Sequence, residues 1–137
     1  MTPGEAELAE QELGLAAEAL REALVLIDAG APRGAISRLY YAAFHGARAV
    51  LAVRGLYTKT HSGQINLFTR ILEPAPLLGR LFELRAAADY GEAKFVRSLE
   101  EVRGLATEAA IFVERCRELV SDAITRGADE PDPPPDL

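Results

Sequence analysis

Apolar residues recur along most of the chain at alternate spacings of three and four, which is the period of an amphipathic α-helix. No stretch of four residues alternates apolar and polar positions with the β-branched or aromatic content of a strand. The pattern therefore predicts an all-α protein, an antiparallel up-and-down bundle of four to five helices. The two clearest stripes are Leu13, Ala16, Leu20, Leu24 and Ile27, and Val102, Leu105, Ala109, Phe112, Cys116, Leu119 and Ala123.

Local signals divide this pattern into five segments. Residues 2–5 and 98–101 each form a capping box, and Gly30 and Gly55 supply helix stops. The glutamates of the first and last segments lie mostly off the apolar stripes, so we expect them to face solvent. The predicted helices cover residues 3–29, 32–54 and 62–72, a fourth segment that ends near residue 90, and a fifth that follows residue 98.

The length and composition predict one domain and a tail. Residues 1–126 are expected to form the helical bundle, and residues 127–137, rich in proline and acid, a flexible tail. No apolar run reaches the ~18 residues of a membrane span, and the N-terminal residues carry no export signal. The single cysteine, Cys116, cannot form an intrachain disulfide. We therefore expect a cytoplasmic protein without a membrane association.

The second predicted helix has two faces suited to burial. Opposite its apolar stripe lie Arg38, Tyr41 and His45, set among small residues such as Ala42 and Gly46. Small residues allow close approach of a backbone, so we expect a second contact there, with a neighbouring helix or another subunit. The polar side chains on this face are either packing residues with hydrogen-bonded tips or part of a ligand-binding face.

Charge is distributed unevenly along the chain. Residues 31–80 carry a net charge of +6, whereas the segments before and after them each carry −6, for a total of −6. Overall acidity argues against bulk, sequence-independent binding to duplex nucleic acid. A local anion site, if there is one, is expected within this basic segment.

Two Arg–His pairs in this segment share one spacing. Arg38 precedes His45 by seven positions, as Arg54 precedes His61. At that spacing both residues of a helical pair lie on one face, where histidine could move a proton and arginine could offset phosphate charge in metal-independent RNA cleavage. Arginine is common here, so the spacing can also arise by chance.

The segment 58–63, Thr-Lys-Thr-His-Ser-Gly, precedes the third predicted helix. With Lys59 it could bind an anion at the helix N-terminus. The alternative is simple capping by Thr60 or Ser62, with His61 an exposed loop residue. The two histidines have no His-x-x-Glu or Glu-x-x-His partner, so we expect no metal site and no cofactor.

Three blocks of sequence resemble the HEPN domain family, in particular its small stand-alone prokaryotic members. They are Ser-Arg-Leu-Tyr-Tyr-Ala-Ala-Phe-His-Gly-Ala-Arg at 37–48, Lys-Thr-His-Ser-Gly at 59–63 and Leu-Arg-Ala-Ala-Ala-Asp-Tyr at 84–90. The resemblance implies a helical bundle, often a homodimer, and a minimal nucleotidyltransferase partner encoded alongside. Many such pairs act as toxin and antitoxin. The HEPN member is then a metal-independent RNase, and other members are described as nucleotide-binding.

RNase members of this family carry an arginine followed, after four to six residues, by a histidine. The corresponding place here is Arg85 to Tyr90, where Asp89 or Tyr90 stands instead of histidine. The motif is therefore degenerate. Catalytic candidates are Arg38, His45 and His61; candidates for binding nucleotide or RNA are Arg38, Tyr41, Lys59, His61, Arg85, Asp89 and Tyr90.

Three functions remain open at this point. The first is a HEPN protein that binds nucleotide or RNA and pairs with a nucleotidyltransferase in a toxin–antitoxin-like module. The second is a metal-independent RNase toxin. The third is a non-catalytic helical module whose dimer seam contains Ala42 and Gly46.

Overall fold

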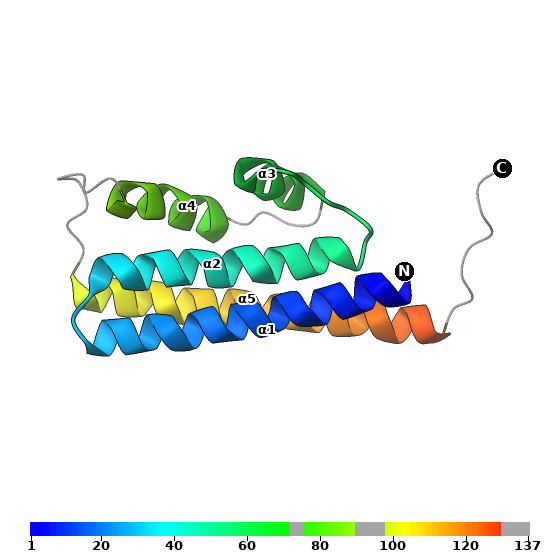
Figure 1. The fold of residues 1–137 in the computed structure, drawn as a ribbon, viewed down its shortest axis with the longest axis horizontal. Coiled ribbons are helices and arrows are strands. Elements are labelled where there is room, and N and C mark those ends of the chain that lie inside the picture. Colours follow the sequence, from blue (N-terminus) through cyan, green and yellow to red (C-terminus); the bar gives the residue numbers. More distant parts are fainter. Residues whose placement is uncertain (72–75, 90–97, 130–137) are drawn as a thin grey trace.

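The computed structural model describes residues 1–71, 76–89 and 98–129. Long helices α1, α2 and α5 lie side by side, and the shorter α3 and α4 lie along the other side of α2 (Figure 1). No strand occurs within these ranges, so the predicted all-α bundle is confirmed. The helices are α1 (Pro3–Asp28), α2 (Pro32–Ala52), α3 (His61–Ile71), α4 (Pro76–Asp89) and α5 (Leu99–Asp129).

The helix ends follow the local signals. In the capping box of α1, the backbone N–H of Glu5 donates to Thr2 Oγ1 at 3.1 Å, and that of Thr2 donates to Glu5 Oε1 at 2.8 Å. Gly30 has φ 74° and Gly55 has φ 69°, the left-handed conformation that favours glycine after a helix. The helix α2 ends two residues earlier than expected, at Ala52. These signals therefore set the turn between α1 and α2 and the loop that leads to α3.

Helix α2 is the centre of the bundle and contacts each of the other four helices. Thirteen of its residues are buried, among them Ile36, Leu39, Tyr40 and Leu51. A helix that is apolar nearly all round must be enclosed by other helices. Side chains that do reach the surface of α2 therefore lie at the grooves between it and its neighbours.

The small-residue face of α2 is covered by α5 of the same chain. Ala42 is fully buried, and a Cβ added at Gly46 would lie 3.4 Å from Cys116 Sγ and 3.7 Å from Val113 Cγ2. The predicted second contact is thus with a neighbouring helix. A dimer seam built on Ala42 and Gly46 is wrong, because both residues are already enclosed within one chain.

The ends of the chain add two observations. Helix α5 is described to Asp129, and the rest of the predicted tail lies outside the described residues. Among the described helices, none is long and apolar enough to cross a membrane.

Candidate functional site

The start of α3 is fixed by Thr60. Its Oγ1 accepts the backbone N–H of Gly63 at 3.0 Å, and its carbonyl oxygen accepts that of Gln64 at 3.1 Å. Capping by Thr60 was one of the two expected roles for this segment. His61 is the first residue of the helix and is half-buried, so the expectation that it is an exposed loop residue is wrong.

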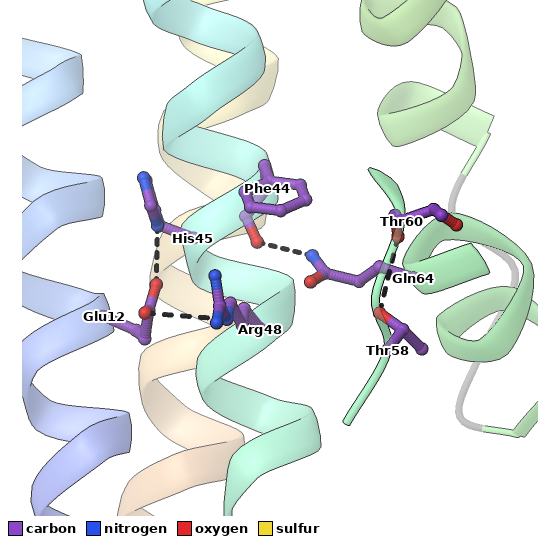
Figure 2. A network of polar contacts seen from close by, with 7 residues as sticks. All are labelled: Glu12, Phe44, His45, Arg48, Thr58, Thr60 and Gln64. Carbon is purple, nitrogen blue, oxygen red and sulfur yellow. Dashed lines mark hydrogen bonds and ion pairs between the residues drawn. The ribbon is translucent and has the colours of Figure 1, made fainter. Parts of the chain in front are cut away.

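Gln64 ties this end of α3 to α2. Its side chain is buried, and its Nε2 donates to the carbonyl oxygen of Phe44 at 2.8 Å (Figure 2). One turn earlier, the His61 ring stacks on the Phe44 ring with centroids 4.1 Å apart and planes 23° apart. Gln64 therefore positions His61 against α2.

His61 is also hydrogen-bonded to Tyr40 of α2. The Tyr40 hydroxyl lies 2.6 Å from His61 Nδ1. Burial raises the pKa of Tyr40 to about 12, so the phenol keeps its proton near neutral pH. Burial lowers the pKa of His61, and the nearby Arg85 guanidinium lowers it further, so the neutral imidazole is favoured. When Tyr40 donates to Nδ1, the imidazole proton is on Nε2.

Arg85 reaches the same place from α4. Its guanidinium carbon lies 5.3 Å from the Tyr40 ring centroid and 5.2 Å from that of Tyr41, which is cation–π distance. Its Nε lies 3.2 Å from Asp89 Oδ2, although this buried nitrogen makes no hydrogen bond of good geometry. Among the residues that the structure describes, the guanidinium therefore faces two tyrosine rings and has one loose carboxylate partner.

Tyr41 is the point where these groups meet. Arg38 lies over its ring at 4.9 Å, the His45 ring is near-parallel to it at 6.2 Å, and the His61 ring meets it edge-on at 6.2 Å. We call Arg38, Tyr41, His45, His61 and Arg85 the Tyr41 cluster. Two guanidiniums, two imidazoles and a half-buried aromatic ring can bind phosphate, exchange protons and stack on a base.

A carboxylate on α1 holds His45 in place. Glu12 Oε2 lies 2.5 Å from His45 Nδ1, and Glu12 Oε1 lies 3.7 Å from Arg48 Nε (Figure 2). The Glu12 residue is only 5% exposed. The expectation that the glutamates of the first helix face solvent is therefore wrong for Glu12. Its position, four residues before Ala16 of the predicted apolar stripe, was the signal in the sequence.

The structure thus brings together most of the candidate residues. Arg38, Tyr41, His45, His61 and Arg85 form one cluster, with Asp89 beside Arg85. The spacing argument for Arg54 and His61 is wrong, because α2 ends at Ala52 and the two residues do not share a helix. Sequence reasoning missed Tyr40, Phe44 and Gln64 as contacts of His61, and Glu12 as the partner of His45.

Two candidates stand apart from the cluster. Lys59 is exposed in the loop before α3, and no hydrogen bond or ion pair joins it to the cluster among the described residues. Tyr90 lies outside the described residues. Within those residues, no three His, Cys, Asp or Glu side chains gather as metal ligands.

The link between Gln64 and Phe44 gives a first prediction. Gln64→Met keeps the side-chain length but removes the hydrogen bond, so His61 should become more exposed. Because burial is the main cause of its lowered pKa, that pKa should rise towards the ordinary value of ~6.5. Titration of the imidazole signals by NMR measures this. Asn66→Met, at an exposed position of α3, is the control, and an equal pKa in both variants would refute the positioning role.

The protein is thus an all-α bundle in which α2, α3 and α4 bring arginine, histidine and tyrosine side chains together. Comparison with known proteins shows to which family this bundle belongs. The HEPN domain family matches residues 9–120. A Methanocaldococcus jannaschii protein named "Putative toxin MJ0605" is 31% identical over 80% of this chain and 87% of its own length. A Gloeobacter violaceus protein named "UPF0332 protein glr0978" is 32% identical over 88% and 99%. The chain belongs to the HEPN domain family.

Proposed function

We propose that this protein binds RNA or a nucleotide through the Tyr41 cluster. The observation that carries the proposal is the position of two guanidiniums, Arg38 and Arg85, at 4.9 and 5.2 Å from one half-buried tyrosine ring. Arginine forks bind phosphate oxygens, and an aromatic ring close to phosphate-binding groups is suited to stacking on a base. The cluster also lies largely within the basic segment 31–80.

We further propose that it acts in a toxin–antitoxin-like module with a minimal nucleotidyltransferase. Membership of the HEPN family and the toxin name of the M. jannaschii relative support this role. If the two proteins form a module, the nucleotidyltransferase should be encoded beside this chain and should co-purify with it after co-expression. Separate elution of the two proteins at micromolar concentration would contradict the pairing.

Metal-independent RNA cleavage is a second candidate, favoured by the position of His61 beside Arg85. Arg85 lacks a histidine four to six residues later, but His61 of α3 contacts the same two tyrosine rings. Its lowered pKa suits a proton acceptor near neutral pH. In the other tautomer, His61 donates its Nδ1–H to the Tyr40 oxygen, and its Nε2 is free to accept the proton of the attacking 2′-hydroxyl. Arg85 would offset charge on the phosphate, and the 5′-oxygen would leave with a proton taken from water.

Incubation with RNA in excess EDTA separates binding from cleavage. If the protein cleaves, cleavage should persist in EDTA and fall at least ~100-fold in His61→Ala. Because the base must be deprotonated, the rate should rise with pH and reach half of its maximum at a pH below the ordinary histidine pKa of ~6.5. Binding without cleavage at any protein concentration removes this candidate and leaves the binding proposal intact.

A further inference from the structure

A groove between α1 and α2 lies next to the Tyr41 cluster. Its lining includes Glu18 and Glu22 from α1, and Arg38, Tyr41 and His45 from α2. Arg38 and Tyr41 therefore belong both to the groove and to the proposed binding site. A ligand with its phosphate on Arg38 and its base on Tyr41 would place its next chemical group in this groove.

The groove presents hydrogen-bond acceptors. In its neutral form the His45 ring donates its Nδ1–H to the buried Glu12 carboxylate at 2.5 Å and presents Nε2 as an acceptor. Figure 2 shows this second nitrogen at the end of the ring away from Glu12, and no hydrogen bond occupies it among the described residues. Glu18 and Glu22 are exposed carboxylates, the latter 3.8 Å from Arg38.

This chemistry fits a sugar hydroxyl better than a second phosphate. Carboxylates repel phosphate but accept hydrogen bonds from hydroxyls, and acidic residues recur as partners of the ribose 2′-hydroxyl. That hydroxyl is the group by which a protein tells RNA from DNA. We propose that the groove is a ribose subsite in which His45, held by Glu12, and the two α1 carboxylates select ribonucleotides over deoxyribonucleotides. This inference rests on the proposed binding function.

The test compares RNA and DNA oligonucleotides of identical sequence by fluorescence anisotropy at pH 8. The protein should bind the RNA at least ~10-fold more tightly, the effect of one good hydrogen bond to a charged or polar group. His45→Phe keeps an aromatic ring beside Tyr41 but removes the acceptor, and should reduce the ratio of the two affinities to below ~3-fold.

A second variant tests the same proposal in case His45→Phe does not fold. Glu18→Gln with Glu22→Gln alters two exposed residues of the groove and should also reduce the ratio. Glu7→Gln with Glu10→Gln makes the same charge change at exposed α1 positions outside the groove lining and should leave the ratio unchanged. Equal binding of RNA and DNA, or a ratio unaffected by both groove variants, overturns the subsite while the binding function stands. Absence of binding to both oligonucleotides overturns the proposed binding of RNA by the cluster.

Discussion

Replacing Arg38 and Arg85 together with alanine should weaken RNA binding by at least ~100-fold, because each hydrogen bond to a charged group contributes about 1.5–3 kcal/mol. The guanidinium carbons of Arg38 and Arg85 lie 4.9 and 5.2 Å from the centroid of the Tyr41 ring, so both should contact the same ligand. Fluorescence anisotropy with a labelled single-stranded RNA measures the change. The dependence of affinity on salt should also become shallower, because fewer phosphates are neutralised.

The control removes the same charge elsewhere. Arg117→Ala with Arg126→Ala deletes two positive charges from exposed positions on α5, outside the Tyr41 cluster. If binding depends on the cluster, this variant should lose less than ~3-fold in affinity. Equal losses in the two double variants, with helical content unchanged by circular dichroism, would show that the protein binds only through its overall charge.

Replacing Glu12 with alanine should destabilise the fold by about 2–3 kcal/mol. The Glu12 side chain is 7% exposed and lies 2.5 Å from His45 Nδ1 and 3.7 Å from Arg48 Nε. Its removal leaves the half-buried His45 Nδ1 without its acceptor and a space between α1 and α2. Partial exposure of His45 and Arg48 keeps the cost below that of breaking a fully buried ion pair. Urea unfolding at pH 7 measures the free energy.

A neighbouring glutamate provides the comparison. Glu10→Ala, at an exposed position of α1, should change the free energy of unfolding by less than ~0.5 kcal/mol. The double variant Glu12→Ala, His45→Ala should cost less than the sum of its single changes, because the two side chains contact each other. The same cost for Glu10→Ala and Glu12→Ala would mean that the Glu12 contacts contribute nothing measurable.

The fold could be predicted because its signals are local. Helical period places Leu13 and Ile27 on one stripe, and the capping box at Thr2 and the stop at Gly30 depend only on residues a few positions away. The prediction that α2 has a second contact face follows in the same way from the helical period, which places its small residues opposite the apolar stripe. Which neighbour covers that face, α5 or another subunit, is decided by packing between segments some seventy residues apart.

The candidate site was predicted only in part, for the same reason. Arg38, Tyr41 and His45 follow one another at helical spacing, so the helical period alone places them on one face of α2. The hydrogen bond between Tyr40 and His61 depends on the path of the loop 53–60, and Gln64 has no sequence pattern that indicates its bond to Phe44. The helical period predicts that Tyr40 is a core residue. In the structure its hydroxyl is also the hydrogen-bond partner of His61.

The central claim is that RNA or nucleotide binds at the Tyr41 cluster, and NMR mapping of the unaltered protein tests it most directly. A short single-stranded RNA is titrated into isotopically labelled protein, and amide and imidazole signals are followed. The account predicts that the largest shifts fall on the imidazoles of His45 and His61 and on amides near Arg38, Tyr41 and Arg85. Shifts confined to α5, or no shifts at millimolar RNA, would contradict it.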